Sequence, residues 1–241
     1  LARGVVNKRG ERYEVRWTQP PRAKPAFATL ALPPCAIQDG WLVSRSIDDL
    51  LGCAVSLATL RRAAELKLKT NLTVLLHRAE EVGFMGALDL IAEGTVSKDD
   101  TVLSIESSRE LPGALPGKGP VIRLGDKACL FDPNATALLD DAAAALKRPI
   151  QRLRLTGGTC EATAYLAFGY EAGGVAVPLV NYHNGWGAKA IAPEKVRLTD
   201  VEGAVALLVE AARQFPDKTL RGTVRRRLTD RHRSNARRLS L

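Results

Sequence analysis

Four segments of this sequence carry acidic and imidazole side chains of the kinds that bind metal ions and activate water. They contain Asp48–Asp49, Glu80–Glu81, Glu106 and His183. Carboxylates and imidazole are the usual ligands of a hydrolytic zinc ion, and a further carboxylate beside the metal can take a proton from water. Each segment comes where a predicted strand ends, and ligands gather at the carboxyl ends of strands in an α/β sheet. We therefore expect the four segments to converge.

The adjacent pair Glu80–Glu81 predicts two different roles. Successive side chains at a strand end point in different directions, so both carboxylates do not easily bind the same ion. One would bind metal, and the other would be free to act as a general base. Other readings stay open: paired acids are mostly solvated, Asp48–Asp49 could only cap a helix, and His183 could be a hydrogen-bonded loop residue. Glu106 is harder to dismiss, because a carboxylate buried after an apolar run is costly without a partner.

The elements that would position these residues alternate between short apolar strands and helices from about residue 38 onward. This alternation predicts an α/β fold, with a mixed, mostly parallel sheet flanked by helices. Apolar spacing and helix-start signals predict helices over 50–66, 86–93, 134–146, 159–168 and 199–215. Apolar runs predict strands over 72–76, 101–105, 120–124, 150–155 and 174–180.

The two ends of the chain differ from this body. Residues 1–37 hold a predicted strand at Tyr13–Trp17 followed by five prolines, which indicates a small β-rich region. Residues 217–241 form an Arg-rich tail, which leaves residues 38–216 as the principal domain.

The net charge of +9 also belongs to the ends. Residues 221–241 carry eight Arg and one Asp, and residues 1–24 carry seven basic and two acidic residues, which leaves −3 for residues 25–220. An Arg-rich terminus with few aromatic residues is more often solvated than a specific nucleic-acid reader, so we do not expect a nucleic-acid partner. The tail could also form a helix packed on an acidic neighbour.

The cysteines and the apolar runs exclude other classes. The four cysteines form no CxxC pair, so neither a zinc knuckle nor a disulfide framework is indicated, and we expect reduced thiols in the cytoplasm. No apolar run approaches the roughly 20 residues needed to cross a bilayer, so no membrane partner is expected.

Six short segments follow one another in a specific order. They are SIDDLLGCAV, AEEVGFMGA, LSIES, GKGPVIRLGD, GGTCEATAY and VNYHN. Their order and intervals resemble the co-catalytic two-zinc aminopeptidases of the tetrahedral-aminopeptidase and glutamyl-aminopeptidase type, and more distantly the wider clan of zinc aminopeptidases and carboxypeptidases. The resemblance covers residues 46 to about 212. Its most specific parts are the Asp-Asp-x-x-Gly and Glu-Glu-Val-Gly-x-x-Gly-Ala segments.

The resemblance implies a set of metal ligands. Asp48 would bridge two zinc ions, Glu81 and His183 would complete one site, and Glu106 would bind the second metal. Cobalt and manganese suit the same ligands.

The resemblance also implies the other roles. Glu80 would be the general base, and Asp49 would orient the site rather than bind metal. Gly157, Gly158 and Thr159 match a glycine-rich loop that borders the substrate pocket, where small residues let the substrate backbone approach. In the closest aminopeptidases an Asp follows Gly-Gly-Thr. This chain has Cys160–Glu161 there, and Glu161 is the candidate replacement.

A second departure concerns the metal ligands. These families carry a further histidine in a His-x-Asp segment, on an early strand before the bridging Asp. The histidines here are His77, His183 and His232, and His77 is expected to pack near the site. The second site would then keep only Asp48 and Glu106. We interpret the chain as lacking an N-terminal portion, in preference to a natural pseudoenzyme, with a sheet edge or core surface exposed as a result.

These expectations favour a metal-dependent exopeptidase. It would be an aminopeptidase that removes N-terminal residues from peptides through a metal-activated water, and we expect it to be a homo-oligomer. Residues 1–37 would be the remnant of a small β insertion domain. The alternative is a non-catalytic binding or assembly protein on the same fold, motivated by the incomplete metal set.

Overall fold

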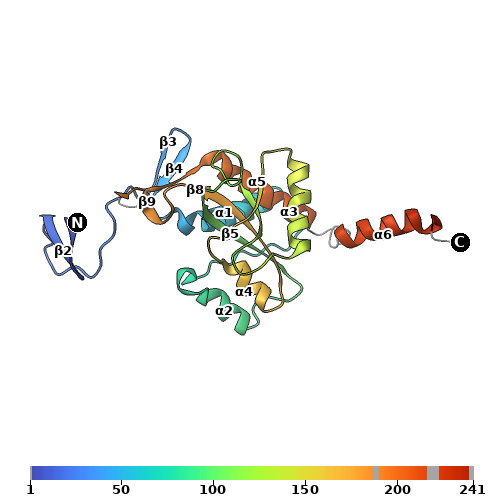
Figure 1. Ribbon diagram of the computed structural model, residues 1–241, viewed down its shortest axis with the longest axis horizontal. Helices are drawn as coiled ribbons and strands as arrows, with labels where there is room; N and C mark the ends of the chain where they lie inside the picture. Colours follow the sequence, from blue (N-terminus) through green and yellow to red (C-terminus); the bar gives the residue numbers. More distant parts are fainter. Residues whose placement is uncertain (1, 187–189, 216–222, 239–241) are drawn as a thin grey trace.

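The central sheet is built around β8. Its strand order is β5-β8-β6-β7, in which β8 runs parallel to β5 and antiparallel to β6, and β6 runs parallel to β7. The strands span Thr101–Arg109 (β5), Val121–Gly125 (β6), Gln151–Arg154 (β7) and Glu171–Leu179 (β8). The computed structural model describes residues 2–186, 190–215 and 223–238 (Figure 1).

Helices cover both faces of this sheet. On one face lie α1 (Ile47–Glu65), α3 (Pro133–Leu146) and α5 (Leu198–Gln214). On the other face lie α2 (Met85–Ala92) and α4 (Glu161–Ala167). The mixed, mostly parallel sheet flanked by helices is therefore confirmed.

Alternating side chains of β8 supply both halves of the core. Val175, Val177 and Leu179 pack with α1, α3 and α5, whereas Ala172 packs with α2 and α4. All four are fully buried. This alternation follows from the two-residue period of a strand, and the near-continuous apolar run of β8 fits a strand covered on both faces.

A second, antiparallel sheet leads into the two long helices. Its strands are β3 (Ala36–Gln38), β4 (Trp41–Ser44) and β11 (Glu194–Arg197), with β4 in the middle. β4 comes just before α1, and β11 comes directly before α5. The pairing of β4 with β11 therefore places the first turn of α1 beside Glu194.

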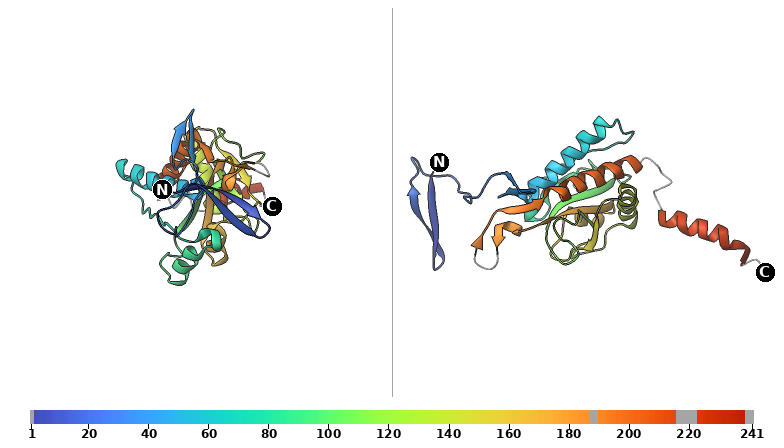
Figure 2. Two further views of the ribbon diagram at one scale, coloured as in Figure 1. Left: turned by 90° about the vertical axis from the view of Figure 1, so that its left-hand side faces the viewer. Right: turned by 90° about the horizontal axis from the view of Figure 1, so that it is seen from above.

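Two segments extend from opposite ends of the body (Figures 1 and 2). The hairpin of β1 (Arg3–Arg9) and β2 (Arg12–Gln19) is exposed along its whole length. The Arg-rich tail contains α6 (Thr223–Asn235), which contacts α3, and a 3-10 turn at Ala236–Arg238. Residues 216–222 and 239–241 of the tail lie outside the described residues.

Short elements complete the chain. Two 3-10 turns span Glu80–Val82 and Tyr182–Asn184, and two short strands, β9 (Gly185–Trp186) and β10 (Ala190–Ile191), pair with each other. Among the helices of the described residues, none combines the length and apolar character that a bilayer crossing requires.

Two expectations about the strands were wrong. Residues 72–76 are not a strand, because in the described part of the chain they have no neighbouring strand with which to pair. Glu106 does not follow its strand, because β5 continues to Arg109 with β8 beside it along all nine residues. The division into residues 1–37, 38–216 and 217–241 stays a prediction.

Candidate metal centre

Three of the predicted ligands meet at one place. Asp48, Glu81 and His183 each offer a ligand atom, and these atoms lie within 4.8 Å of one another. His183 Nε2 is 3.2 Å from Asp48 Oδ2 and 3.9 Å from Glu81 Oε1. The Asp48 side chain is only 10% exposed, while those of Glu81 and His183 are 67% and 52% exposed. Two carboxylates and an imidazole are ligands of the kinds, and of the number, that a catalytic zinc site uses.

Asp48 is held in place by a residue that the sequence did not indicate. The backbone amides of Ile47 and Asp48 donate to Glu194 Oε2 at 2.7 and 3.1 Å, and Glu194 is buried. Glu194 fills the role of a helix cap at the start of α1, where free amides favour negative charge. Glu194 is the first residue of β11, 146 residues away from Asp48 in the sequence, so no local pattern indicated this contact.

Burial and negative neighbours change the acidity of Asp48. Burial, followed by the negative charges of Glu81, Glu194 and Glu80, raises its pKa from 3.8 to about 7. The site therefore carries more negative charge than its surroundings neutralise. A bound cation would relieve this excess, so the residues present fit a divalent metal.

Asp49 points to different partners. Its Oδ1 accepts hydrogen bonds from Ser107 Oγ at 2.8 Å and from the Gly52 amide at 3.0 Å. Burial raises the pKa of Asp49 to about 7, although these two hydrogen bonds oppose the shift. A Cβ at Gly52 would lie 2.1 Å from Asp49 Oδ2 and 2.8 Å from the Ile105 carbonyl oxygen. The glycine of the Asp-Asp-x-x-Gly segment is therefore required by the approach of α1 to Asp49 and β5.

Glu80 and Glu81 lie on a 3-10 turn with separate surroundings. Glu81 reaches the metal cluster, while Glu80 is absent from it. Burial first, and Glu81 second, raise the pKa of Glu80. A Cβ at Gly86 would lie 2.8 Å from both the amide nitrogen and the carbonyl oxygen of Arg78, so the last glycine of the Glu-Glu-Val-Gly-x-x-Gly segment allows this tight turn.

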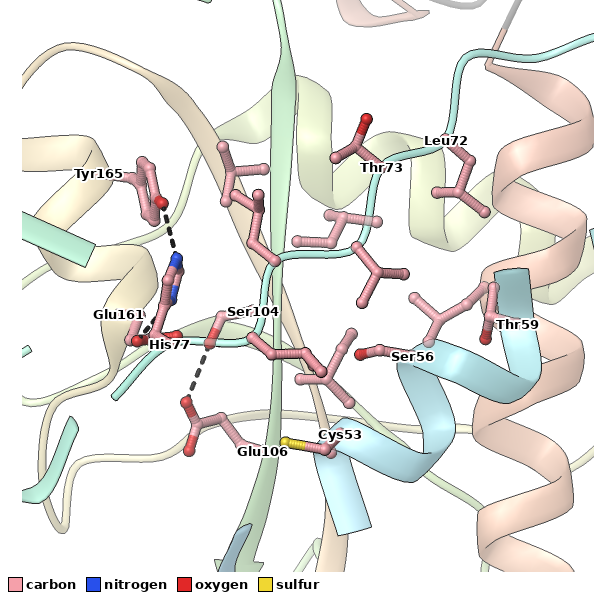
Figure 3. Close-up of a pocket in the computed structure, with 18 of the residues that line it drawn as sticks. Cys53, Ser56, Thr59, Leu72, Thr73, His77, Ser104, Glu106, Glu161 and Tyr165 are labelled. Atoms are coloured by element: carbon pink, nitrogen blue, oxygen red, sulfur yellow. Dashed lines mark hydrogen bonds and ion pairs between the residues drawn. The ribbon is translucent and has the colours of Figure 1, made fainter. Parts of the chain in front are cut away.

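Glu106 lies outside the cluster of three. It sits within β5, where it accepts a hydrogen bond from Ser104 Oγ at 2.9 Å (Figure 3). Burial raises its pKa well above the ordinary value, and the charges of Asp49 and Glu80 add to the shift. Glu106 lines the same cavity as Asp48, Asp49, Glu80 and Glu81. Its role at a second metal stays a prediction.

Arg123 is a second residue that sequence reasoning missed. It lies in β6, is 4% exposed, and its positive charge opposes the rise in the pKa of Glu106. Its guanidinium carbon lies 5.6 Å from the centre of the Phe131 ring. A charged residue inside the apolar run PVIRLG was a usable signal, because a buried arginine requires a partner.

The predicted substrate loop leads to Glu161, which lines the same cavity as Glu80 and Glu106. Gly157 and Gly158 are exposed, with open space where a Cβ would lie, and Thr159 is exposed as well. Glu161, the first residue of α4, has its Oε1 2.7 Å from His77 Nδ1, and His77 Nε2 is 3.3 Å from the Tyr165 hydroxyl (Figure 3). His77 thus lies near the site, as expected, and its ring is hydrogen-bonded to the carboxylate of Glu161.

Comparisons with known proteins place this geometry in a family. A family model described as M42 glutamyl aminopeptidase matches residues 26–192. A putative aminopeptidase from Acetivibrio thermocellus is 27% identical over 184 residues, which cover 73% of this chain and 52% of that protein. This chain therefore spans about half the length of the curated relative that it matches.

Solved structures share the fold. The TET aminopeptidase from a marine-sediment Thaumarchaeota archaeon matches with a TM-score of 0.66 and 22% identity, over 78% of this chain and 54% of that one. The TET1 peptidase of Pyrococcus horikoshii, which can assemble into a tetrahedron or a large octahedral shell, matches with a TM-score of 0.59 and 22% identity, over 74% and 52%. Because the family model matches more than half of its residues, this chain belongs to the M42 glutamyl aminopeptidase family.

Proposed function

We propose that the protein to which these 241 residues belong is a metal-dependent aminopeptidase, and that this chain carries one of its metal sites and its general base. The observation that carries the proposal is the cluster of Asp48, Glu81 and His183, with ligand atoms within 4.8 Å of one another, in a chain of this family. Zinc is the proposed ion, with cobalt or manganese as substitutes.

The residues around the cluster have complementary tasks. When bound, a zinc ion supplies Lewis-acid chemistry that polarises a peptide carbonyl and makes water more acidic. Glu80 stands outside the cluster and accepts the proton from the attacking water. The raised pKa of Glu80 makes its carboxylate a stronger base. Asp49, fixed by Ser107 and Gly52, orients the start of α1 rather than binding metal.

The substrate side is proposed from the exposed loop and the relatives. A peptide would approach along Gly157, Gly158 and Thr159, with Glu161 facing its amino end, and Glu106 would serve a second metal. A homo-oligomer is proposed because a structural relative is a TET peptidase that assembles into shells. The cytoplasmic location stays a prediction.

Zinc binding by the chain itself is the deciding test. We expect equilibrium dialysis to show one zinc per chain, and His183→Ala to weaken binding by at least about 100-fold, because it removes a direct ligand. His232→Ala is the matched control, since His232 is an exposed residue of α6. Equal zinc affinity in both variants would refute the proposed site.

The adjacent glutamates test the division of roles without any activity assay. Glu81→Gln should abolish tight zinc binding, because it removes a charged ligand, whereas Glu80→Gln should leave the stoichiometry unchanged. The two substitutions alter neighbouring residues of one turn by the same chemical change. The assignment of ligand and base is reversed if Glu80→Gln loses the metal and Glu81→Gln keeps it.

Hydrolysis of leucine p-nitroanilide is the complementary measurement. Because the second site has only Asp48 and Glu106, we expect the zinc-loaded chain to hydrolyse this substrate at the background rate. Activity of these 241 residues alone would contradict the account of a missing ligand. A chain that binds no zinc and has no activity would instead support a non-catalytic binding or assembly role.

A further inference from the structure

Three side chains form a hydrogen-bonded row in the cavity of about 650 Å³ beside β5 (Figure 3). Glu161 Oε1 lies 2.7 Å from His77 Nδ1, and the Tyr165 hydroxyl lies 3.3 Å from His77 Nε2. The side chains of His77 and Glu161 are only 8% and 19% exposed, so water competes little for the contact between them. The row therefore holds the imidazole of His77 in a defined place.

The partners of His77 determine which of its ring nitrogens carries the proton. An ionised carboxylate only accepts hydrogen bonds, so the proton of the neutral ring lies on Nδ1, facing Glu161. Nε2 then accepts a hydrogen bond from the Tyr165 hydroxyl. Tyr165 is itself fixed, because it is 1% exposed and the ring of Tyr170 packs edge-on against it at 5.3 Å. The neutral imidazole thus acts as a donor to Glu161.

His77 engages one oxygen of Glu161 and leaves the other free. Among the described residues, the side chain of Glu161 has a hydrogen bond from His77 alone, and that bond is made to Oε1. A neutral donor leaves the negative charge of the carboxylate in place. A charged oxygen without a donor, in a largely enclosed position, is suited to a charge-assisted hydrogen bond from an ammonium group.

The position of this carboxylate follows from the burial of its neighbour. Cys160, which comes directly after Gly-Gly-Thr, is fully buried and packs with Ala162 and Tyr165. A side chain at position 160 therefore points into the core, and Glu161 is the next residue that lines the cavity. Glutamate has more rotamer freedom to lose than a shorter acidic side chain, so it needs a partner that fixes its carboxylate.

The backbone at the start of α4 is held by Asp126, a fully buried residue after β6. Asp126 Oδ2 accepts hydrogen bonds from the Cys160 amide at 3.1 Å and from the Thr163 hydroxyl. Asp126 Oδ1 accepts from the amides of Ala128 and Cys129 at 2.8 and 3.2 Å. The first turn of α4 is thus tied to the end of β6.

The backbone that carries His77 has an anchor of its own. The amide of Gly86, in α2, donates to the carbonyl oxygen of Arg78 at 3.0 Å. A Cβ at Gly86 would lie 3.2 Å from the Cβ of His77, so α2 packs directly on this segment. Two separately anchored segments therefore bring His77 and Glu161 together, which is how a site is preorganised.

We propose that His77 is the positioning residue for Glu161: it holds one carboxylate oxygen, and the other oxygen binds the ammonium group of the substrate's first residue. The proposal rests on the proposed aminopeptidase function for the identity of the ligand, the amino end of a peptide. Tyr165 acts through His77 by fixing its tautomer. An amino end bound here lies in the cavity that Glu80 also lines.

Binding of leucinamide to the zinc-free chain tests the role of Glu161. Leucinamide has a free ammonium group and no carboxylate, and N-acetyl-leucinamide is the matched ligand without the ammonium. We expect saturable binding of leucinamide in an NMR titration, and a loss of at least about tenfold in affinity with Glu161→Gln, which removes the charged acceptor. Glu161→Gln should leave any binding of N-acetyl-leucinamide unchanged.

Two substitutions of His77 separate positioning from packing. His77→Leu keeps most of the volume but removes the donor, and it should weaken leucinamide binding by about tenfold. His77→Asn loses volume but places an amide N–H near the position of Nδ1, so it should stay within about threefold of the original affinity. A residue that only fills space would give the opposite order.

The tautomer of His77 supplies a measurement that needs no ligand. Nitrogen-15 NMR of the neutral ring should show the proton on Nδ1, and Tyr165→Phe should shift the population toward the Nε2–H form. Tyr170→Phe is the matched control, because the Tyr170 hydroxyl donates to the carbonyl oxygen of Val96 at 3.1 Å instead. This control should leave the ring spectrum of His77 unchanged.

Several results would overturn the proposal. They are the proton of His77 on Nε2 in the unmodified chain, no saturable binding of leucinamide, or equal losses with His77→Leu and His77→Asn. Because no zinc is present, these failures are distinct from failure of the proposed function. A chain that binds leucinamide through Glu161 but never binds zinc would refute the metal site alone. Zinc binding together with leucinamide binding that ignores Glu161→Gln would refute the role of His77 and Glu161 alone.

Discussion

β5 and β8 are adjacent strands of equal length, yet they have different environments. In β8 every residue after Glu171 is buried, whereas in β5 only Ser104 and Ser107 are buried. β5 has only three apolar residues, Val102, Leu103 and Ile105, but these too are only half-buried, so its more polar composition explains only part of the difference. β8 has a strand on each side and helices on both faces, while β5 pairs only with β8 in the described part of the chain and borders a cavity of about 650 Å³. The comparison teaches that neighbouring segments, as well as the strand's own residues, decide its burial.

The apolar core and the buried carboxylates also lie mainly in different halves of the body. The half of the body around β8, α3 and α5 contains most of the apolar core. The half around β5 and α1 contains the carboxylates whose pKa values are raised, including Asp48, Asp49 and Glu106. The buried carboxylates, whose negative charge a cation would neutralise, are thus attached to the well-packed core around β8, α3 and α5.

The largest expected effect on the free energy of unfolding comes from the same substitution, Leu to Ala, made in each of the two halves. Leu207→Ala, at a fully buried position of α5, should lower the free energy of unfolding by about 2–5 kcal/mol. Leu72→Ala, at a half-buried position that lines the cavity beside β5, should lower it by less than about 1 kcal/mol, because less buried apolar surface is lost. Denaturant unfolding of the two variants measures both values. Equal costs would remove the distinction between the halves.

A substitution at the contact between α1 and β5 should have the next largest effect on stability. Gly52→Ala should destabilise the chain by about 1–3 kcal/mol, because the new Cβ overlaps Asp49 and the Ile105 carbonyl. Gly158→Ala is the matched control and should stay within about 0.5 kcal/mol, since nothing lies near its Cβ. A neutral Gly52→Ala would mean that α1 does not approach β5 this closely.

The carboxylates predict a pH dependence of the metal-free chain. Burial raises the pKa values of Asp48 and Asp49 from 3.8 to about 7, so between these values the folded chain holds protons that the unfolded chain releases. Stability should therefore be present below about pH 4 and fall as the pH rises to about 7. Urea midpoints measured along this range should show the fall.

The matched variant for this dependence is Asp49→Asn, which removes one titrating group and should flatten the slope. Added zinc should also restore stability at pH 7, because a ligand that binds the folded state shifts the equilibrium toward it. A urea midpoint that rises from pH 4 to 7 would show that these carboxylates are paired in the folded chain.

The smallest effect is expected from the hairpin. Deleting residues 1–24 should change the free energy of unfolding by no more than about 0.5 kcal/mol, because β1 and β2 are exposed along their whole length. Thermal or urea unfolding provides the measurement. A large loss would show that the hairpin packs on the body in solution, and that a third region belongs in the comparison.

Much of the fold was readable from local patterns. The helix predicted over 134–146 forms as α3, where Asp132 accepts hydrogen bonds from the amides of Asn134 and Ala135 at the helix start. The strand predicted over 174–180 forms as β8, which begins three residues earlier, at Glu171. These elements carry their own signals in capping residues and apolar spacing.

The candidate site was readable only in part. Asp48, Glu81 and His183 meet as predicted, although the ligand assignments themselves stay a proposal. Glu194 and Arg123 were missed, because each acts on a residue far away in the sequence. Glu106 was placed after its strand, because the apolar run ends before the pairing with β8 does.

The sequence by itself determined where the principal helices form and which segments carry the carboxylate and imidazole side chains of the candidate site. Only the tertiary structure decided that segment 72–76 belongs to no described sheet, that Gly52 has no room for a side chain, and that Glu194 holds the start of α1. Helix capping and periodicity act over a few residues. Strand pairing and burial depend on neighbours supplied by distant segments, so no local pattern encodes them.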